Sequence, residues 1–248
     1  MTSVSSNSVR SAIVLAAGNG DRFVNRTRDS KLLHPLLGKP LLLRTLDSVA
    51  EAGITRAIVV VGYQADRVRA LVERGAPDDL RVSFAYNPEW RLENGVSVVA
   101  ARPLAPRRFA LLMGDHVFEP RVLEHLVHVP LDRDESLLAV DARPAPADVA
   151  AEATKVRRQG SRIVAIGKHL VEYDALDTGL FVCSDTLFDA LTAARGGGDT
   201  TLSGGIRQLA NVGLMRALEI GDATWCDIDT VSDLEAAESA LGVTPEPA

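Results

Sequence analysis

The stretch "IVLAAGNGDRF", residues 13–23, decides the fold that this sequence predicts. An apolar run leads directly into two glycines, an aspartate and an arginine, which is typical of a strand followed by a turn. Similar apolar runs recur in "RAIVVVG", "VSFAY" and "FALLMGD", and helical patterns begin between them near Leu41 and Ala65. Continuous apolar runs suit strands that are buried on both faces of a parallel sheet. The first part of the chain therefore predicts an α/β fold with right-handed crossovers.

The composition is that of a globular protein with a sizeable core. The 248 residues are 46% hydrophobic and 24% charged, which suits one larger domain or two small ones. The net charge is -6 and the 27 basic residues are spread along the chain, so we do not expect nucleic acid as a partner. Cys183 and Cys226 lack C-x-x-C spacing, which fits a reducing compartment and argues against a disulfide framework or a cysteine metal site.

Changes in sequence texture predict how the chain is organised. After Arg143 a Pro/Ala-rich connector leads to two strand-like runs around Gly160, which indicates a small β-rich excursion from a single domain. We expect that domain to cover residues 11–240, between a flexible N-terminus (1–10) and a flexible tail (241–248). The chain has no signal-peptide core, and no segment approaches about 18 uninterrupted apolar residues, so a cytoplasmic protein without a membrane partner is expected.

The glycine-rich turn after the first strand suggests an anion site. Glycine lets backbone N–H groups converge on a phosphate without a side chain in the way. Two familiar nucleotide motifs do not fit, because "GNGDRF" lacks the third glycine of G-x-G-x-x-G and "LLGKPL" lacks the first glycine and the Ser/Thr of a P-loop. Arg22 and Lys31 remain, and they would hold a triphosphate. An ordinary turn with solvent-facing charges explains the same residues equally well.

Carboxylates in two distant segments suggest a magnesium site. Asp115 in "LLMGDHVF" follows a buried strand, at the edge where open α/β sheets bind ligands. Asp227 and Asp229 in "TWCDIDTVSDL" are two apart in an extended segment, so both lie on one face. Either could join Asp115 on magnesium, a hard ion that takes carboxylate and phosphate oxygens. The segment also reads as a helix start that Thr230 or Ser232 would cap.

These motifs, in this order, resemble the sugar-phosphate nucleotidyltransferases. The matching stretches are "LAAGNGDRF…SKLLHPLLGKPLL", "NPEWRLENGVSVVAAR", "LLMGDHVFEP", "IGKHL…YDALDTGLFVC" and "WCDIDTVSDLEAAE", and they extend over residues 11–240. Within that superfamily they are most similar to the CTP:inositol-1-phosphate cytidylyltransferases, with phosphocholine and phosphonate cytidylyltransferases as near relatives. The resemblance implies a Rossmann-like, mostly parallel sheet flanked by helices, with a small β-rich excursion on the acceptor side.

The resemblance also implies roles for individual residues on the nucleotide side. The residues expected around the base and phosphates are Ala16, Ala17, Gly18, Gly20, Arg22, Lys31, Gly95, Ser97 and Asp115. We add Tyr63, which follows a strand end and would line the base pocket. Arg22, Lys31 and Asp115 are the residues expected to carry catalysis. One departure is Ser30, because many family members have proline before the loop lysine.

On the acceptor and metal side the implied residues are fewer. Lys155, Asp177 and Thr178 would face the acceptor. Asp115 and Asp229 would hold Mg²⁺, with Asp229 preferred because it matches the family's D-T at the helix entry. Asp227 stays open as the alternative. His116 is expected to orient Asp115 or contact ribose, since a phosphate dianion is already a nucleophile and needs no base.

The expected activity is the transfer of CMP from CTP to a phosphate monoester, with release of pyrophosphate. Inositol 1-phosphate ranks first among acceptors. Aminoethyl- or hydroxyalkylphosphonate, phosphocholine and a sugar 1-phosphate are the alternatives, and phosphocholine ranks lower because only 4% of residues are aromatic and none cluster into a cation cage. A regulatory nucleotide-binding module would not need the second acidic cluster. Small-molecule substrates are the expected partners, and a homodimer stays open.

Overall fold

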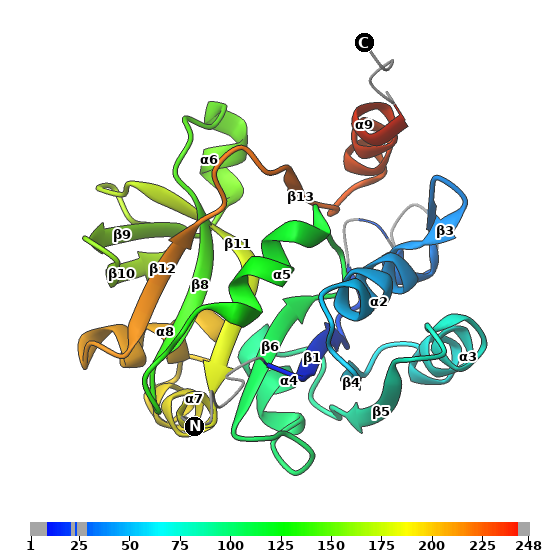
Figure 1. The fold of residues 1–248 in the computed structure, drawn as a ribbon, viewed down its shortest axis with the longest axis horizontal. Helices are drawn as coiled ribbons and strands as arrows, with labels where there is room; N and C mark the ends of the chain where they lie inside the picture. Colours follow the sequence, from blue (N-terminus) through cyan, green and yellow to red (C-terminus); the bar gives the residue numbers. More distant parts are fainter. Residues whose placement is uncertain (1–8, 21–22, 24–28, 243–248) are drawn as a thin grey trace, which may run out of the picture.

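The computed structural model describes residues 9–20, 23 and 29–242. Its main feature is a nine-stranded sheet with the order β5-β4-β1-β6-β11-β8-β12-β10-β9 (Figure 1). One half is parallel and consists of β5 (Arg81–Tyr86), β4 (Arg56–Val61), β1 (Ser11–Ala16) and β6 (Arg108–Met113). The α/β fold predicted from the apolar runs is therefore confirmed.

The second half of the sheet is mixed. Its strands are β11 (Ala175–Ser184), β8 (Ser136–Asp141), β12 (Met215–Glu219), β10 (Arg162–Gly167) and β9 (Lys155–Gln159). β11 is antiparallel to both β6 and β8, whereas β12 is parallel to β8. The β-rich excursion predicted after Arg143 is thus part of the same sheet and forms its far edge. The sheet is less uniformly parallel than the resemblance implied, because β11 joins the two halves in the antiparallel sense.

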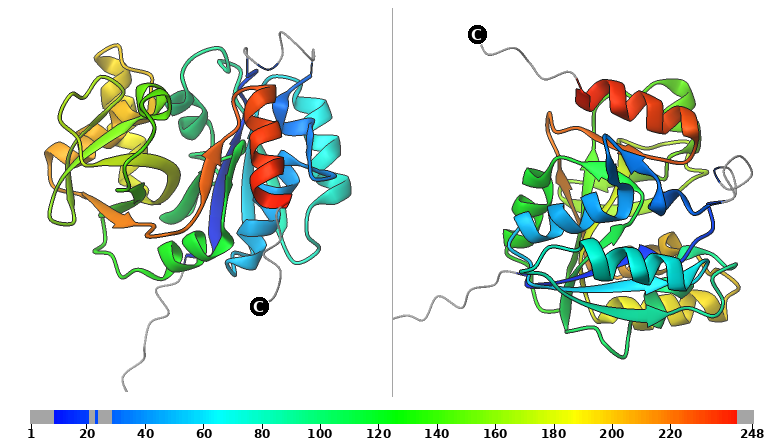
Figure 2. Two further views of the ribbon diagram at one scale, coloured as in Figure 1. Left: turned by 90° about the horizontal axis from the view of Figure 1, so that it is seen from above. Right: turned by 90° about the vertical axis from the view of Figure 1, so that its right-hand side faces the viewer.

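Helices cover both faces of the sheet (Figure 1; Figure 2). Alternate residues of β1 point into opposite cores, with Val14 in one and Ile13 and Leu15 in the other. The first core includes residues of α2 (Leu41–Glu51), α3 (Ala65–Gly75) and α5 (Pro120–His128). The second includes residues of α4 (Asn94–Ala100), α7 (Thr186–Gly196) and α8 (Leu202–Asn211). Burial on both faces is what makes the β1 run continuously apolar.

Two short strand pairs and a C-terminal helix stand beside the main sheet. β7 (His116–Phe118) pairs with β13 (Trp225–Asp227), and β2 (Pro35–Leu36) pairs with β3 (Lys39–Pro40). α9 (Val231–Gly242) lies against the β2–β3 pair, where Ala237 joins Leu36 in a small apolar cluster (Figure 2). The remaining elements are the 3-10 turn η1 (Lys31–Leu33) and α6 (Ala147–Glu152).

The predictions for the termini concern mostly residues 1–8 and 243–248, which lie outside the described residues. Val9, inside the predicted flexible N-terminus, is buried, and α9 continues to Gly242. Among the described residues, no helix combines the length and apolar character needed to cross a membrane.

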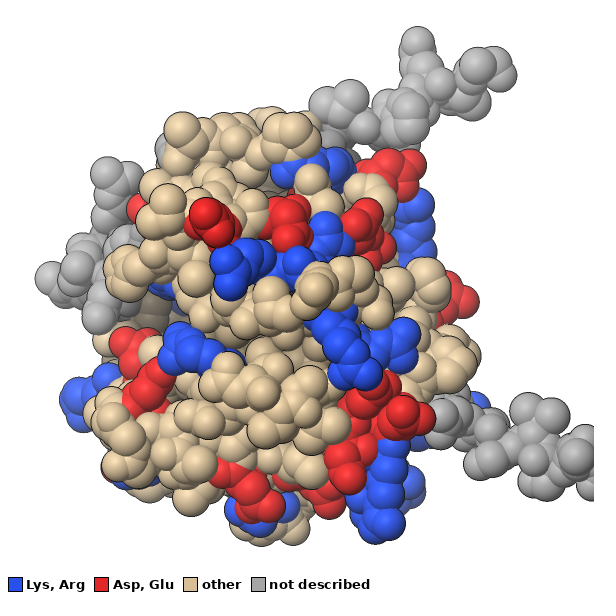
Figure 3. Space-filling view, turned by 90° about the vertical axis from the view of Figure 1, so that its left-hand side faces the viewer, with Lys and Arg blue, Asp and Glu red and all other residues tan. Residues whose placement is uncertain are grey.

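The surface carries charges of both signs close together. On the face formed by the β9–β10–β12 edge, Lys/Arg and Asp/Glu side chains alternate (Figure 3). Arg158 there forms ion pairs with Asp174 and Glu219, and Arg157 pairs with Glu172. Since each of these cations faces a carboxylate, this face offers no continuous surface for a polyanion.

Candidate active site

The carboxyl ends of β1 and β6 open onto a cleft of about 1560 Å³. One wall consists of the turn after β1 together with Trp90 and Ser97. The opposite wall comes from the second half of the sheet and includes Asp177 and Lys168. Asp115, at the end of β6, and the segment around β13 lie between these walls. The cleft is at the position where open α/β sheets bind their ligands.

The turn after β1 uses its glycines for two different purposes. A Cβ atom on Gly18 would meet nothing within 4 Å, so this backbone is open to a ligand. Gly20 has φ +61°, and a Cβ atom there would lie 3.3 Å from Cγ and Cδ of Lys31. The aliphatic part of Lys31 therefore lies directly against Gly20. Arg22 belongs to the part of the chain outside the described residues, so its role stays a prediction.

Ser30, which replaces the family's proline, has a structural function. Its backbone N–H donates a hydrogen bond to Oε1 of Gln64 at 3.2 Å. Proline has no N–H and could not make this bond. The bond links the residue before Lys31 to the turn after β4, so the loop has a substitute for the rigidity that proline would supply.

Lys31 is a buried cation between two carboxylates. It is 7% exposed, and its Nζ lies 2.7 Å from Oδ2 of Asp115 and 2.7 Å from Oδ1 of Asp229. Burial favours the neutral amine, but the carboxylates of Asp115, Asp227 and Asp229 outweigh it and raise the pKa of Lys31 above its usual value. Lys31 is therefore a permanent positive charge next to Asp115 and Asp229, two carboxylates that line the cleft.

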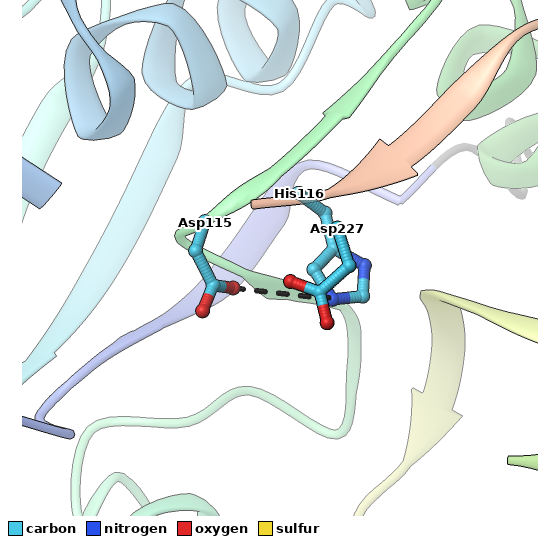
Figure 4. A group of neighbouring side chains, drawn as sticks. All are labelled: Asp115, His116 and Asp227. Carbon is cyan, nitrogen blue, oxygen red and sulfur yellow. Dashed lines mark ion pairs between the residues drawn. The ribbon is translucent and has the colours of Figure 1, made fainter. Parts of the chain in front are cut away.

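Asp115, His116 and Asp227 form a compact group of potential metal ligands (Figure 4). One ligand atom from each lies within 4.8 Å of the others, and Nε2 of His116 is 3.5 Å from Oδ1 of Asp227. The pairing of β7 with β13 sets His116 opposite Asp227. Nδ1 of His116 donates to the carbonyl oxygen of Thr178 at 2.8 Å, which leaves Nε2 directed toward the carboxylates.

The charges of this group fit a divalent cation. Burial disfavours the ionised carboxyl of Asp115, but Lys31 and His116 outweigh it and lower its pKa. Burial raises the pKa of Asp227, and the neighbouring Asp115 and Asp229 add to the effect even though His116 and Lys31 oppose it. The ionised form of Asp227 is thus poorly compensated by its protein neighbours. Magnesium, which binds one or two carboxylates plus substrate phosphates, would compensate it.

Asp227 stays the alternative second magnesium ligand, and the preference for Asp229 stays a prediction. The carboxylate of Asp229 contacts the ammonium group of Lys31, and Asp227 is the residue grouped with Asp115 among the described side chains. Both aspartates lie in one extended segment, so only their surroundings distinguish them. Asp227 is paired in β13, whereas Asp229 lies beyond the end of that strand, next to the start of α9.

Three residues expected at the base have different surroundings. Ser97 lines the cleft, and its buried hydroxyl accepts a hydrogen bond from Nδ2 of Asn87 at 2.9 Å. A Cβ atom on Gly95 would lie 2.6 Å from the carbonyl oxygen of Thr200, so Gly95 packs against the segment before α8 instead of facing the cleft. The ring of Tyr63 packs against that of Trp90, with 5.3 Å between the ring centroids, and of these two rings Trp90 lines the cleft.

Only one of the three expected acceptor residues faces the cleft. Asp177 does, and burial raises its pKa to about 6. The hydroxyl of Thr178 instead donates to the carbonyl oxygen of Ala139 in β8 at 2.8 Å, inside the sheet. Nζ of Lys155 donates to the carbonyl oxygen of Lys168 at 2.8 Å, and Lys168 is the lysine that lines the cleft. The "IGKHL" stretch signalled Lys168 only through the family resemblance, because neither charge nor spacing marks it.

Comparison with known proteins finds relatives along most of the chain. The sequence model of the family described as "MobA-like NTP transferase domain" matches residues 12–209. A "Bifunctional IPC transferase and DIPP synthase" of Rubrobacter xylanophilus is 37% identical over 233 residues, which are 93% of this chain and 51% of that protein. A "CMP-5'-(3-aminopropyl)phosphonate synthase" of Streptomyces rubellomurinus is 38% identical over 121 residues, which are 48% of this chain and 19% of that protein.

The solved structures include one that matches from end to end. It is described as the inositol-1-phosphate CTP transferase from T. maritima, and it agrees with a TM-score of 0.82 and 26% identity over 97% of this chain and 98% of that chain. The chain spans about half the length of the curated bifunctional relatives it matches. The α/β arrangement around the cleft is therefore shared with a solved structure across nearly the whole chain.

Proposed function

The chain belongs to the family of MobA-like NTP transferase domains, and from that premise we propose that it transfers CMP from CTP to inositol 1-phosphate. The observation that carries the proposal is the match to the inositol-1-phosphate CTP transferase from T. maritima over 97% of the chain. The 37% identity to a protein named as an IPC transferase, over 93% of the chain, supports the same acceptor. The resemblance to nucleotidyltransferases that the motifs indicate is confirmed by these relatives.

The proposed reaction exchanges one phosphoryl bond for another. A non-bridging oxygen of the acceptor phosphate attacks the α-phosphorus of CTP and forms the new P–O bond. The bond from the α-phosphorus to the oxygen that bridges to the β-phosphorus breaks, and pyrophosphate leaves with the electron pair. The approach of two anions is the main barrier, so catalysis consists mostly of charge neutralisation and positioning.

Residues on the nucleotide side perform most of that work. The open backbone at Gly18 can approach the phosphates closely, because no side chain intervenes. Lys31 supplies a fixed positive charge, and Arg22 remains the second cation of the prediction. Trp90 and Ser97 line the same wall, and we expect them to border the base.

Asp115 together with Asp229 or Asp227 would hold magnesium, which when bound supplies positive charge to the phosphates of the nucleotide. His116 stands beside both carboxylates, and its ring is fixed by the hydrogen bond to Thr178. Since the acceptor phosphate needs no base, we assign His116 the role of orienting Asp227. Asp177 and Lys168 on the opposite wall are the polar groups proposed to face the acceptor.

A phosphonate acceptor is the second candidate. The relative named as a phosphonate synthase supports it, although the match covers only 48% of this chain. A phosphonate has the same attacking oxygens as a phosphate monoester, so the same nucleotide side would serve both. The choice between the two acceptors depends on the opposite wall of the cleft, which includes Asp177 and Lys168.

A pyrophosphate-release screen tests the proposal. The four nucleoside triphosphates are combined with inositol 1-phosphate, 2-aminoethylphosphonate, phosphocholine and glucose 1-phosphate, and Lys31→Ala serves as the matched control for contaminating activity. We expect CTP with inositol 1-phosphate to show the highest kcat/KM and mass spectrometry to show the CMP adduct. A tenfold or greater preference for UTP or dTTP, about 1.4 kcal/mol in the opposite direction, would overturn the nucleotide assignment.

A further inference from the structure

The segment that carries Asp227 is a short strand outside the main sheet. β13 pairs with β7 over three positions, and this pairing sets Asp227 opposite His116. A two-stranded pair is marginally stable at best by itself, so other contacts have to fix it. Side chains alternate along a strand, which puts Trp225 on the same face of β13 as Asp227. The indole of Trp225 lies beside His116, with 6.2 Å between the ring centroids.

The indole of Trp225 fastens this strand to the main sheet. Its Nε1–H donates to Oδ2 of Asp141 at 2.9 Å, and Asp141 is the last residue of β8. The side chain of Asp141 is 14% exposed. Burial disfavours its ionised carboxyl, but Arg143 and the indole of Trp225 outweigh it and lower the pKa of Asp141. Since the acceptor is a charged carboxylate, the bond from the indole belongs to the stronger class of hydrogen bonds.

Arg143 extends the connection to the turn before β13. Its guanidinium donates to both carboxylate oxygens of Asp141, at 2.9 and 2.7 Å. It also donates to the backbone carbonyl oxygen of Ala223 at 2.9 Å, and Ala223 is buried in the first core. The end of β8 thus holds β13 by two routes, one through the side chain of Trp225 and one through the backbone that precedes it.

These contacts join two parts of the cleft that have to work together. β8 belongs to the second half of the sheet, which supplies the wall proposed for the acceptor, whereas β13 carries the carboxylate beside His116. Asp229, the other candidate for magnesium, follows shortly after β13 in the chain and also lines the cleft. A shift of β13 would move both carboxylates, so the consequence is the same whichever of the two binds the ion.

We propose that Trp225 is a positioning residue, whose hydrogen bond to Asp141 keeps β13 and the carboxylates proposed for magnesium at a fixed place relative to the acceptor wall. This inference rests on the proposed function for its kinetic consequences. The hydrogen bond and its effect on metal binding can be measured without substrate.

The first experiment observes the indole directly. The chain has two tryptophans, so Trp90→Phe assigns the two indole N–H signals in an NMR spectrum of ¹⁵N-labelled protein. We expect the indole N–H of Trp225 to exchange with solvent at least about tenfold faster in Asp141→Ala, because it loses its acceptor. Asp222→Ala is the matched control, since Asp222 lies in the turn before β13 and its 88% exposed side chain pairs with Arg121. An unchanged exchange rate in Asp141→Ala would overturn the proposal.

The second experiment measures Mn²⁺ binding by paramagnetic resonance, for the ion alone and with CTP. Trp225→Phe keeps an aromatic ring and removes the N–H donor, and it should weaken Mn²⁺ binding about tenfold, the scale for losing a partner that orients metal ligands. Asp141→Ala should have the same effect, and the double variant should lose less than about twofold more, because both changes break one bond. Asp222→Ala should bind like the wild type.

Three results of the Mn²⁺ measurement would refute the proposal. The first is wild-type affinity in Trp225→Phe. The second is a double variant that loses the product of the two single effects, since Trp225 and Asp141 would then act separately. The third is a wild type that binds no Mn²⁺, since no metal site would then exist for Trp225 to position.

The third experiment separates positioning from a general loss of structure. At saturating Mg²⁺ in the pyrophosphate-release assay, Trp225→Phe should lower kcat about tenfold and change the KM for CTP less than about twofold, because the nucleotide wall is on the other half of the sheet. Asp141→Asn, whose amide oxygen can still accept from the indole, should keep more activity than Asp141→Ala. A raised KM for CTP with unchanged kcat would contradict the assignment. If the wild type is inactive with every substrate pair, the proposed function fails, while the NMR and Mn²⁺ experiments still decide whether Trp225 holds the strand.

Discussion

Replacing Gly179 by alanine should disturb both stability and the acidic group. Gly179 in β11 has φ +76°, a conformation that residues with a Cβ atom rarely adopt. The added Cβ atom would lie 2.4 Å from both Cε1 and Nδ1 of His116, closer than any real contact. The ring must therefore move, and its 2.8 Å hydrogen bond to the carbonyl oxygen of Thr178 must lengthen or break.

The expected loss has two parts. The left-handed backbone conformation costs about 1–2 kcal/mol for a residue with a Cβ atom. The lost hydrogen bond of His116 adds about 1 kcal/mol, and the displaced ring adds about 1 kcal/mol more through lost packing. Gly179→Ala should therefore lower the free energy of unfolding by about 3–4 kcal/mol.

Urea unfolding followed by circular dichroism measures this loss, with Gly160→Ala as the matched control. Gly160 has φ +61° and a Cβ atom there would meet nothing within 4 Å, so its substitution should show only the backbone part. In a His116→Ala background the clash with the ring is absent and only the 3.1 Å approach to Cγ of Met113 remains, so Gly179→Ala should then cost about 1–2 kcal/mol, close to the control. The reasoning is refuted if Gly179→Ala costs no more than Gly160→Ala, or costs the same with and without the His116 ring.

Three further predictions concern the cleft. Lys31→Ala should lower kcat/KM by about 100-fold or more in the pyrophosphate-release assay, the scale for one preorganised transition-state contact; near wild-type turnover would remove Lys31 from the mechanism. Asp115→Asn should abolish metal-dependent turnover, and so should whichever of Asp229→Asn and Asp227→Asn removes the second ligand; a variant that keeps full activity at limiting Mg²⁺ would exclude its residue as a ligand. Burial raises the pKa of Asp177 to about 6, so the carboxyl stabilises the fold below its unfolded pKa and this contribution is lost as pH rises toward 6. Asp177→Asn should therefore be more stable than the wild type at pH 7.5, by at most about 3 kcal/mol of unfolding free energy, and should melt at a higher temperature. Near pH 4 the two proteins should not differ. A lower melting temperature of the variant at pH 7.5 would contradict this.

The parallel half of the sheet could be predicted because its signal is local. Residues 12–16 of β1 are all apolar, and such a run has to be buried on both faces wherever it lies. The antiparallel half could not be predicted in the same way. The sequence of β11 does not say that it lies between β6 and β8, because strand neighbours are chosen by contacts among distant segments.

The acceptor residues show the same limit at the scale of single side chains. The "DTG" motif places Asp177 and Thr178 next to each other, and a regular strand would alternate them between two faces. The pairing of β11 with β8 is irregular between Asp177 and Phe181. The hydroxyl of Thr178 donates a hydrogen bond to the carbonyl oxygen of Ala139 inside the sheet, while Asp177 faces the cleft. Which of the two faces the cleft depends on how β11 pairs with its neighbours.

The sequence by itself determined the α/β fold, the glycine turn, and the presence of Asp115 at a strand end, since each depends on residue types that are neighbours in the chain. It could not choose between Asp227 and Asp229 as the second magnesium ligand. Side chains two positions apart in an extended segment lie on the same face, so the pattern treats the two alike. Tertiary structure gives the two carboxylates different neighbours. The pairing of β13 with β7 brings Asp227 to His116, and the cap of α9 directs Asp229 to Lys31. Those contacts join segments about 100 to 200 positions apart, and only the folded chain brings such segments into hydrogen-bonding distance.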